Sequence, residues 1–536
     1  MNTSKVVVGA GKLQHHIASS QNRILIKSGT LFFEDKTIKA DIYAEDGIIR
    51  EIGTGISVPG GIRVVDAKGK LVFPGAIDGD TNFQFNHAGV SVHDDVYIGS
   101  KKCLAGGSTT FLDYIIPNEG ENLISAFERT MEAMNQKACC DFSLKCVVRE
   151  LTDRTLNDIT TLIQKGISIF HISTGYSRNL TDDDLNTLMS HLSAKNCLLS
   201  ASAFDSLAYY NGLDGTTKVD NYLEKYDSAK DKAYVLKLVQ IAKITSCRVV
   251  FVDVISEDIA NVIDPSSYIM ITSSHVTMDN PCEKGDLKSK LSKFILPPLL
   301  NAEKRKKLVG YLGKNLTNLT VVSSHRGYKD DQKTSTSKDV KSLVPGCGGA
   351  VERLSVLWDV TQSKTNPICD PNQFVRYVST NPAMMFNMFP KKGTFRVGSD
   401  ADIVIWDSEL KRNLGVEDQI QLTSSAFQGV LATGAPHIII CNGKVVFDED
   451  ARLRFSQGSG RFIPIHFDAK NGESVTPAVV DKPIAEVKNE EKPVDSKVDE
   501  TTNQVASAKA PVANTNTYHS SIKIHNPPGG KSSGIW

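Results

Sequence analysis

The chain has 536 residues, 40% of them hydrophobic, and its 61 Lys and Arg residues equal its 61 Asp and Glu residues. This length allows a large buried core, while zero net charge excludes a global field that would attract nucleic acid or an anionic membrane. The ten cysteines form no CxxC pair, and no apolar run reaches ~18 residues, which favours reduced thiols in a cytosolic protein without a membrane span.

Residues 1–21 are expected to be a flexible leader. From Arg23 onward the pattern becomes β-rich, with Asp46-Gly47 as a hairpin turn between two alternating runs. Similar strands return at 401–407 and 437–450, where Asn442-Gly443 forms a second hairpin signal. The sequence therefore predicts a small β-sandwich domain built from both ends of the chain, residues 22–73 and 395–467.

Residues 74–394 alternate strands with helices. Helical patterns at 121–137, 181–195 and 229–244 separate short apolar runs rich in β-branched residues, as buried parallel strands are. The expected strands are 71–78, 108–115, 142–148, 167–173, 197–203, 248–254, 267–272 and 318–323. Eight such units predict an α/β fold with a (β/α)₈ TIM-like barrel. A doubly wound sheet stays open as the alternative, because periodicity does not show whether a sheet closes.

Residues 468–536 change character, becoming rich in Lys, Glu, Pro, Ser and Thr, which predicts a disordered tail. Thr476 precedes a proline and is a candidate phosphorylation site. The final segment, "IKIHNPPGGKSSGIW", adds a few apolar residues. These predict a short docking motif, although a tail end can carry such residues by chance.

Polar residues stand where the predicted barrel strands end, and in such barrels the active site lies at those ends. The candidates are Asp80 and Asn82 after the first strand, His171 on the fourth, Ser202 on the fifth, Asp253 on the sixth and Ser324 after the eighth.

Several blocks carry a resemblance, among them "VPGGIRVVDAKGKLVFPGAID" and "VSTNPAMMFNMFPKKGTFRVGSDADIVIWD". Over roughly residues 22–467 the chain resembles the dihydropyrimidinase-like amidohydrolases. It is most similar to their non-enzymatic relatives, the collapsin response mediator proteins, also called dihydropyrimidinase-related proteins. The resemblance implies a hydrolase barrel joined to a small β-domain.

The resemblance also implies a set of site residues. Active members hold two zinc ions with a His-x-His pair, a carboxylated Lys, two further His and an Asp. In register, this chain has Asp80, Asn82, His171, Ser202, Asp253 and Ser324. Every metal-ligand position differs, including that of the general base, while Tyr176 matches the family's substrate-holding tyrosine.

We therefore expect a pseudoenzyme with no catalytic residue, no binuclear metal and no cofactor. Two alternatives stay open. Asp80, His171 and Asp253 could hold one divalent metal, which would make the protein a cyclic amidase with an altered mononuclear site. The pocket could also bind a small molecule without chemistry.

The resemblance further implies a homo- or hetero-tetramer with paralogues that binds tubulin or microtubules. Such proteins act in axon guidance, axon outgrowth and neuronal polarity, in the cytoplasm of neurons and their axons. Their tail is the regulated, phosphorylated part. Neither nucleic acid nor a membrane is an expected partner.

Overall fold

A computed structural model describes residues 22–467 except 59, 178–179, 215–216, 280–286, 335–339, 364, 416–422, 424, 449 and 451. All of these belong to one unit, Met1–Ala485. The predicted leader, the predicted tail and Thr476 lie outside the described residues. Within the described ranges, no helix is long and apolar enough to cross a membrane. The nine cysteines described are all free and buried.

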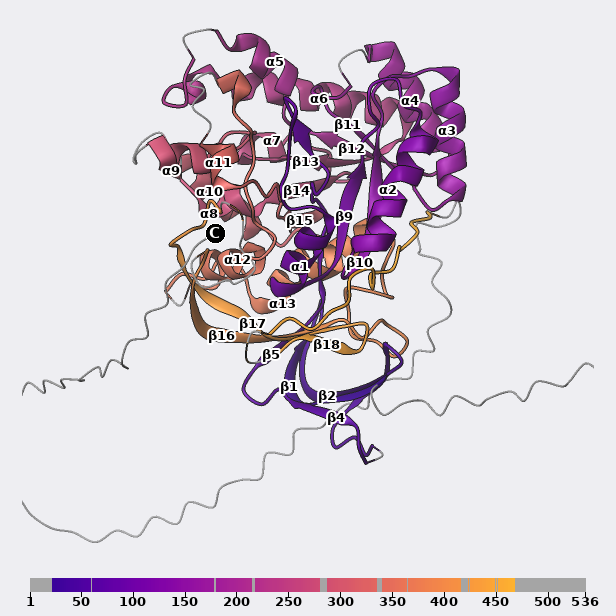
Figure 1. Ribbon diagram of the computed structural model, residues 1–536, viewed down its shortest axis with the longest axis vertical. Coiled ribbons are helices and arrows are strands. Elements are labelled where there is room, and N and C mark those ends of the chain that lie inside the picture. Colours follow the sequence, from indigo (N-terminus) through magenta and orange to yellow (C-terminus); the bar gives the residue numbers. More distant parts are fainter. Residues whose placement is uncertain are drawn as a thin grey trace, which may run out of the picture. The chain divides into compact units, whose positions relative to one another are not determined.

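Eight parallel strands form the barrel predicted from the sequence (Figure 1). Their order is β15-β14-β13-β12-β11-β10-β9-β6. Asn82 N donates to His325 O at 3.1 Å and Ser324 N donates to Asp80 O at 2.9 Å, which joins the last strand to the first. The strands are β6 (Ala76–Asp78), β9 (Ser108–Ile115), β10 (Asp141–Val147), β11 (Ile169–Ile172), β12 (Leu198–Ser202), β13 (Arg248–Val252), β14 (Tyr268–Thr272) and β15 (Leu319–Val322). The doubly wound alternative is therefore wrong.

A second eight-stranded sheet, drawn from both ends of the described chain, runs β18-β17-β16-β5-β1-β2-β3, with β4 paired to β1. Side chains from all eight strands pack into one core that is separate from the barrel core. The strands are β1 (Arg23–Phe32), β2 (Thr37–Glu45), β3 (Ile48–Gly53), β4 (Arg63–Asp66), β5 (Leu71–Pro74), β16 (Ile403–Asn413), β17 (Leu431–Cys441) and β18 (Lys444–Phe447).

The single strand expected at 71–78 is two strands in different sheets, because the chain changes sheet at Gly75. Gly75 N donates to Asp402 O of the small domain at 2.7 Å, and Ala76 N donates to Gly107 O at 3.1 Å. A Cβ on Gly75 would lie 2.2 Å from Thr109 Oγ1, so only glycine fits this close crossing.

The end of the predicted small domain also differs from expectation. Phe142 N of β10 donates to Arg461 O at 3.0 Å, and Ile465 N donates to Gly166 O at 2.9 Å. The segment around Phe462 therefore pairs with the barrel rather than with the small sheet.

Helices cover the outside of the barrel (Figure 1). Thr181 caps its helix as predicted, because its Oγ1 accepts from Asp184 N at 3.1 Å and Asp184 caps it in return. The α-helices are α1 (Val96–Ala105), α2 (Leu123–Lys137), α3 (Asp153–Gln164), α4 (Asp182–Ala194), α5 (Ser206–Gly212), α6 (Ser228–Thr245), α7 (Glu257–Ala260), α8 (Ser273–Thr277), α9 (Leu287–Ser292), α10 (Ala302–Leu312), α11 (Asp330–Lys333), α12 (Arg353–Thr361), α13 (Pro371–Val375) and α14 (Asn381–Met385). Shorter elements are β7 (Asn86–His87), β8 (Val90–Ser91), η2 (Tyr222–Lys225), η3 (Val340–Ser342) and the π-helical turn η4 (Arg376–Thr380).

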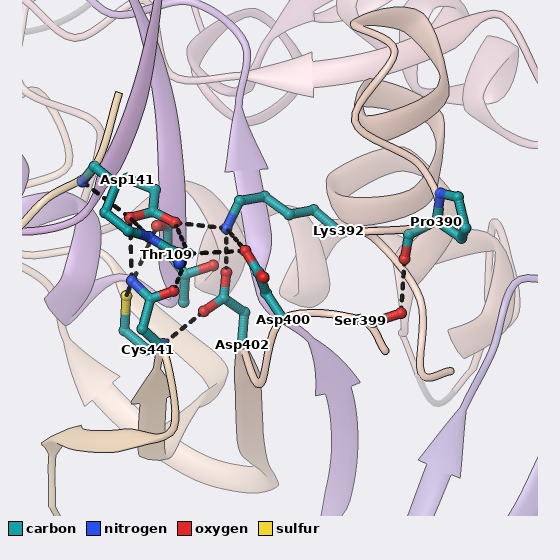
Figure 2. A network of polar contacts seen from close by, with 10 residues as sticks. Thr109, Asp141, Pro390, Lys392, Ser399, Asp400, Asp402 and Cys441 are labelled. Carbon is teal, nitrogen blue, oxygen red and sulfur yellow. Dashed lines mark hydrogen bonds and ion pairs between the residues drawn. The ribbon is translucent and has the colours of Figure 1, made fainter. Parts of the chain in front are cut away.

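A buried ion cluster joins the small domain to the start of β10 (Figure 2). The Lys392 ammonium lies 2.8 Å from Asp141, 3.0 Å from Asp400 and 2.7 Å from Asp402. Burial alone lowers the pKa of Lys392, but the three carboxylates outweigh it and raise that pKa well above its usual range. Because Asp141 is the first residue of β10, this junction lies at the amino ends of the barrel strands, opposite the predicted site.

Candidate functional site

A cavity of about 960 Å³ opens at the carboxyl ends of the barrel strands. Of the predicted site residues, Asp80, Asn82, His171, Tyr176, Ser202 and Asp253 line it. Ser324 lines a small adjoining cavity together with Asp253. The structure therefore brings together every predicted site residue that it describes.

Asp80 is the most heavily bonded of these residues and is only 3% exposed. Its Oδ1 accepts from Lys145 Nζ at 2.6 Å and from the Tyr114 hydroxyl, and its Oδ2 accepts from Ser324 Oγ at 2.6 Å. Burial raises the pKa of Asp80, but the charge of Lys145 and the three hydrogen bonds outweigh it and lower that pKa. Asp80 is therefore an ionised carboxylate with both oxygens engaged.

Lys145 supplies the cation of this pair and was not among the predicted site residues. It lies on β10, is fully buried, and also donates to Gly79 O at 3.0 Å. Its ammonium is 4.1 Å from the centroid of the Tyr114 ring. The available signal was the single charge inside the buried run "FSLKCVV", because a lysine is almost never fully buried without a partner.

His171 lies beside this pair as a neutral imidazole. Its Nδ1 is 2.9 Å from Ser200 Oγ, and its ring meets that of Tyr114 edge-on with centroids 4.9 Å apart. Burial and the nearby Lys145 charge lower the pKa of His171 to about 3. A group of this pKa is a weak general base near neutral pH.

Asp253 faces the cavity from the end of β13 and accepts a hydrogen bond from Ser202 Oγ at 2.8 Å. Burial and the negative charge of Asp80 raise its pKa to about 6. Since the unfolded carboxyl titrates near 3.8, ionisation of Asp253 destabilises the fold, and this penalty develops as pH rises from about 4 to about 6.

Replacing Asp253 with Asn should therefore stabilise the protein. We expect a gain of about 1–3 kcal/mol at pH 7, less than the full shift implies because Asp253 is half-buried and water screens it. The gain should vanish near pH 4, where the native carboxyl is protonated. Thermal melting of both proteins across this range checks the prediction, and an equal difference at both pH values would contradict it.

Tyr176 and Asn82 complete the predicted set. Arg149 stacks on the Tyr176 ring at 5.4 Å, and burial raises the pKa of the Tyr176 hydroxyl to about 12. The Asn82 side-chain amide is buried, and its Nδ2 has no hydrogen-bond partner among the described residues. Both residues belong to the pocket wall.

His325, which follows Ser324, is a structural residue rather than a base. Its Nε2 is 2.8 Å from Asp94 Oδ2, and its Nδ1 accepts from Gly349 N at 3.0 Å and Ala350 N at 3.1 Å. Asp94 also binds Lys102 at 2.6 Å. Both ring nitrogens of His325 are thus engaged inside the fold.

The donor set at the barrel mouth does not suit a binuclear zinc centre. An ammonium binds the Asp80 carboxylate that would serve as a ligand, and the serine hydroxyls are weak zinc ligands. Among the described residues, the only trio with ligand atoms close enough for one ion is Asp141, Asp400 and Asp402, and Lys392 already binds all three (Figure 2).

The comparisons with known proteins agree with this architecture. The model of the amidohydrolase family matches residues 71–446. A crystal structure of a D-hydantoinase superposes with a TM-score of 0.78 at 25% identity, over 83% of this chain and 99% of that one. The chain belongs to the amidohydrolase family.

Two groups of curated relatives are similar to it. Rat dihydropyrimidinase is 30% identical over 83% of this chain and 89% of the relative. Human dihydropyrimidinase-related protein 5 is 28% identical over 83% of this chain and 82% of the relative. The predicted family is thereby confirmed. Its members similar to this chain include both dihydropyrimidinases and dihydropyrimidinase-related proteins.

Proposed function

We propose that this chain is a non-catalytic member of the amidohydrolase family that acts as a protein-binding scaffold of the dihydropyrimidinase-related type. The observation that carries the proposal is the buried ion pair between Lys145 and Asp80, 2.6 Å long, at the mouth of the barrel. A resident ammonium there repels a dication and already satisfies the carboxylate that a metal would need.

The chemistry of the remaining groups supports the same proposal. Hydrolysis of a cyclic amide needs an activated water and a group that polarises the carbonyl. His171 is a weak base, and Ser324 donates its hydroxyl to Asp80. The pKa of Asp253, raised to about 6, suits proton transfer near neutral pH, so a mononuclear amidase would depend on this residue.

As partners we propose tubulin or microtubules, bound by a homo- or hetero-tetramer in the cytoplasm of neurons and their axons. The roles would be axon guidance, axon outgrowth and neuronal polarity. The similarity to dihydropyrimidinase-related protein 5 supports this proposal. So does the tail segment "NPPGGKSSG" (526–534), which resembles the end of the tail in the collapsin response mediator proteins.

Metal analysis of full-length protein purified without chelator, combined with hydrolysis assays on dihydrouracil and hydantoin, tests the enzymatic question. We expect far less than one metal ion per chain and no ring opening, with rat dihydropyrimidinase assayed alongside as the positive control. Near-stoichiometric metal with turnover that Asp253→Asn abolishes would instead establish the mononuclear amidase.

Co-sedimentation with microtubules tests the proposed partner. We expect full-length protein to pellet with microtubules, and Asp253→Asn to pellet equally because the proposed scaffold role uses no chemistry of the cavity. Failure of the full chain to pellet would overturn the partner while leaving the assignment as a non-catalytic protein intact.

A further inference from the structure

Arg326 is a cation of the cavity that forms no ion pair with any described residue. It follows β15, is half-buried, and lines the main cavity together with Asp253 and Tyr176. Its Nε is buried without a hydrogen-bond partner, and its guanidinium has no ion-pair partner among the described residues. It therefore contrasts with Lys145, whose charge is fully engaged.

Packing fixes the position of the Arg326 side chain. The guanidinium stacks on the Phe85 ring with its centre 4.3 Å from the ring centroid. Its aliphatic stem lies against Gly346, where an added Cβ would come within 2.6 Å of Arg326 Cδ. One face of the guanidinium is thus covered by an aromatic ring, and the cavity is the route by which a partner can reach it.

The groups around Arg326 keep its guanidinium charged. Burial lowers its pKa, but Asp253 and the nearby Tyr328 outweigh this and raise it, so the guanidinium stays charged. Asp80 is already neutralised by Lys145. A half-buried guanidinium without a fixed counter-ion favours a carboxylate, which it can bind through two parallel N–H···O bonds.

The walls of the cavity are aromatic and suit a flat ring. The His87 ring stacks between those of Phe85 and Tyr210, with centroids 6.4 Å and 6.0 Å away. Tyr114 and Tyr176 line the same cavity. Rings of this kind bind a planar ligand by offset or edge-on stacking, and the volume of about 960 Å³ accommodates one.

We propose that the cavity binds a planar aromatic carboxylate, with the carboxylate on the Arg326 guanidinium and the ring against Phe85 and Tyr176. The ligand is bound rather than transformed. This proposal does not depend on the tubulin partner, because it rests only on residues of the cavity.

Calorimetric titration of the full-length protein with sodium benzoate, at constant ionic strength, tests the proposal. We expect saturable binding with a Kd of about 1 mM or tighter. Benzamide has the same ring without the charge, and acetate has the charge without the ring, so each should bind at least about tenfold more weakly. Absence of benzoate binding, or equal binding of all three, would overturn the proposal.

Variants locate the interaction on one side chain. Arg326→Gln should weaken benzoate binding about tenfold or more, and Arg326→Lys should weaken it less, because an ammonium keeps the charge but loses the fork. Arg154→Gln is the matched control, since Arg154 is an exposed cation at the same cavity and should change the Kd by less than about twofold.

Equal losses of benzoate affinity in the Arg326 and Arg154 variants would contradict the proposal. They would show that benzoate responds only to the overall positive charge of the cavity. Melting temperatures identify any variant that fails to fold. Saturation-transfer NMR on the wild-type protein gives a second readout, in which the benzoate ring protons should receive saturation that benzamide does not displace. Complete displacement by benzamide would overturn the role of the charge.

Discussion

Replacing Lys145 with Met is expected to destabilise the protein by about 3–5 kcal/mol at neutral pH, because it leaves the Asp80 charge buried without its cation. Asp80 is 3% exposed, so water cannot take the place of the ammonium. The Tyr114 and Ser324 hydroxyls remain as donors, and they limit the loss but do not neutralise the charge. Chemical or thermal unfolding of the full chain measures it.

The double variant Lys145→Met with Asp80→Asn is the matched control and should recover most of the loss, since neither charge is then buried alone. The pH dependence gives a second check. The folded pKa of Asp80 is lowered, so the pair stabilises the fold above about pH 4 and loses its effect as pH falls through the folded pKa. The Lys145→Met penalty should shrink in acid, and a loss below about 1 kcal/mol at pH 7 would contradict the prediction.

Replacing Lys392 with Met should have an effect at least as large, about 3–5 kcal/mol or more, because three buried carboxylates would then repel one another. Each carboxylate lies 2.7 to 3.0 Å from the ammonium (Figure 2), and the Lys392 side chain is 2% exposed. We expect the small domain to be released from the barrel at a lower temperature. Limited proteolysis near the junction, together with melting curves, measures this.

Arg461→Gln is the control for that cluster. Arg461 also binds Asp141, at 2.7 Å, but its side chain is 46% exposed and water can partly replace it. Its loss should be clearly smaller than that of Lys392→Met. Equal losses from the two variants would show that total positive charge matters and that the buried position of Lys392 does not.

The barrel could be predicted because each strand is coded by its own apolar, β-branched run. The strand limits of β9 and β12 follow such runs closely. The change of sheet at Gly75 could not be predicted, because it depends on the approach of Thr109 from a different strand. The dipeptide Pro74-Gly75 was the only local sign in the sequence that the strand is interrupted there.

The polar residues at the strand ends were predicted from position, but their partners were not. Lys145 and Asp80 lie 65 residues apart and meet only because β6 and β10 both contact β9 in the closed barrel. Arg326 likewise depends on Phe85 and Gly346, which come from two different loops. Local sequence patterns do not predict such long-range contacts. A charged residue inside an apolar strand is the one local sign that a buried partner exists.

The Lys145–Asp80 pair also bears on reversibility. Introducing imidazoles at the positions of Asp80 and Asn82 would leave the Lys145 ammonium buried without its carboxylate. Removing Lys145 first would leave the carboxylate without its ammonium. Either order passes through a destabilised intermediate, and Ser202 and Ser324 would still need to change. The ion pair therefore hinders the gain of a metal site. Each single substitution toward such a site is expected to destabilise the fold.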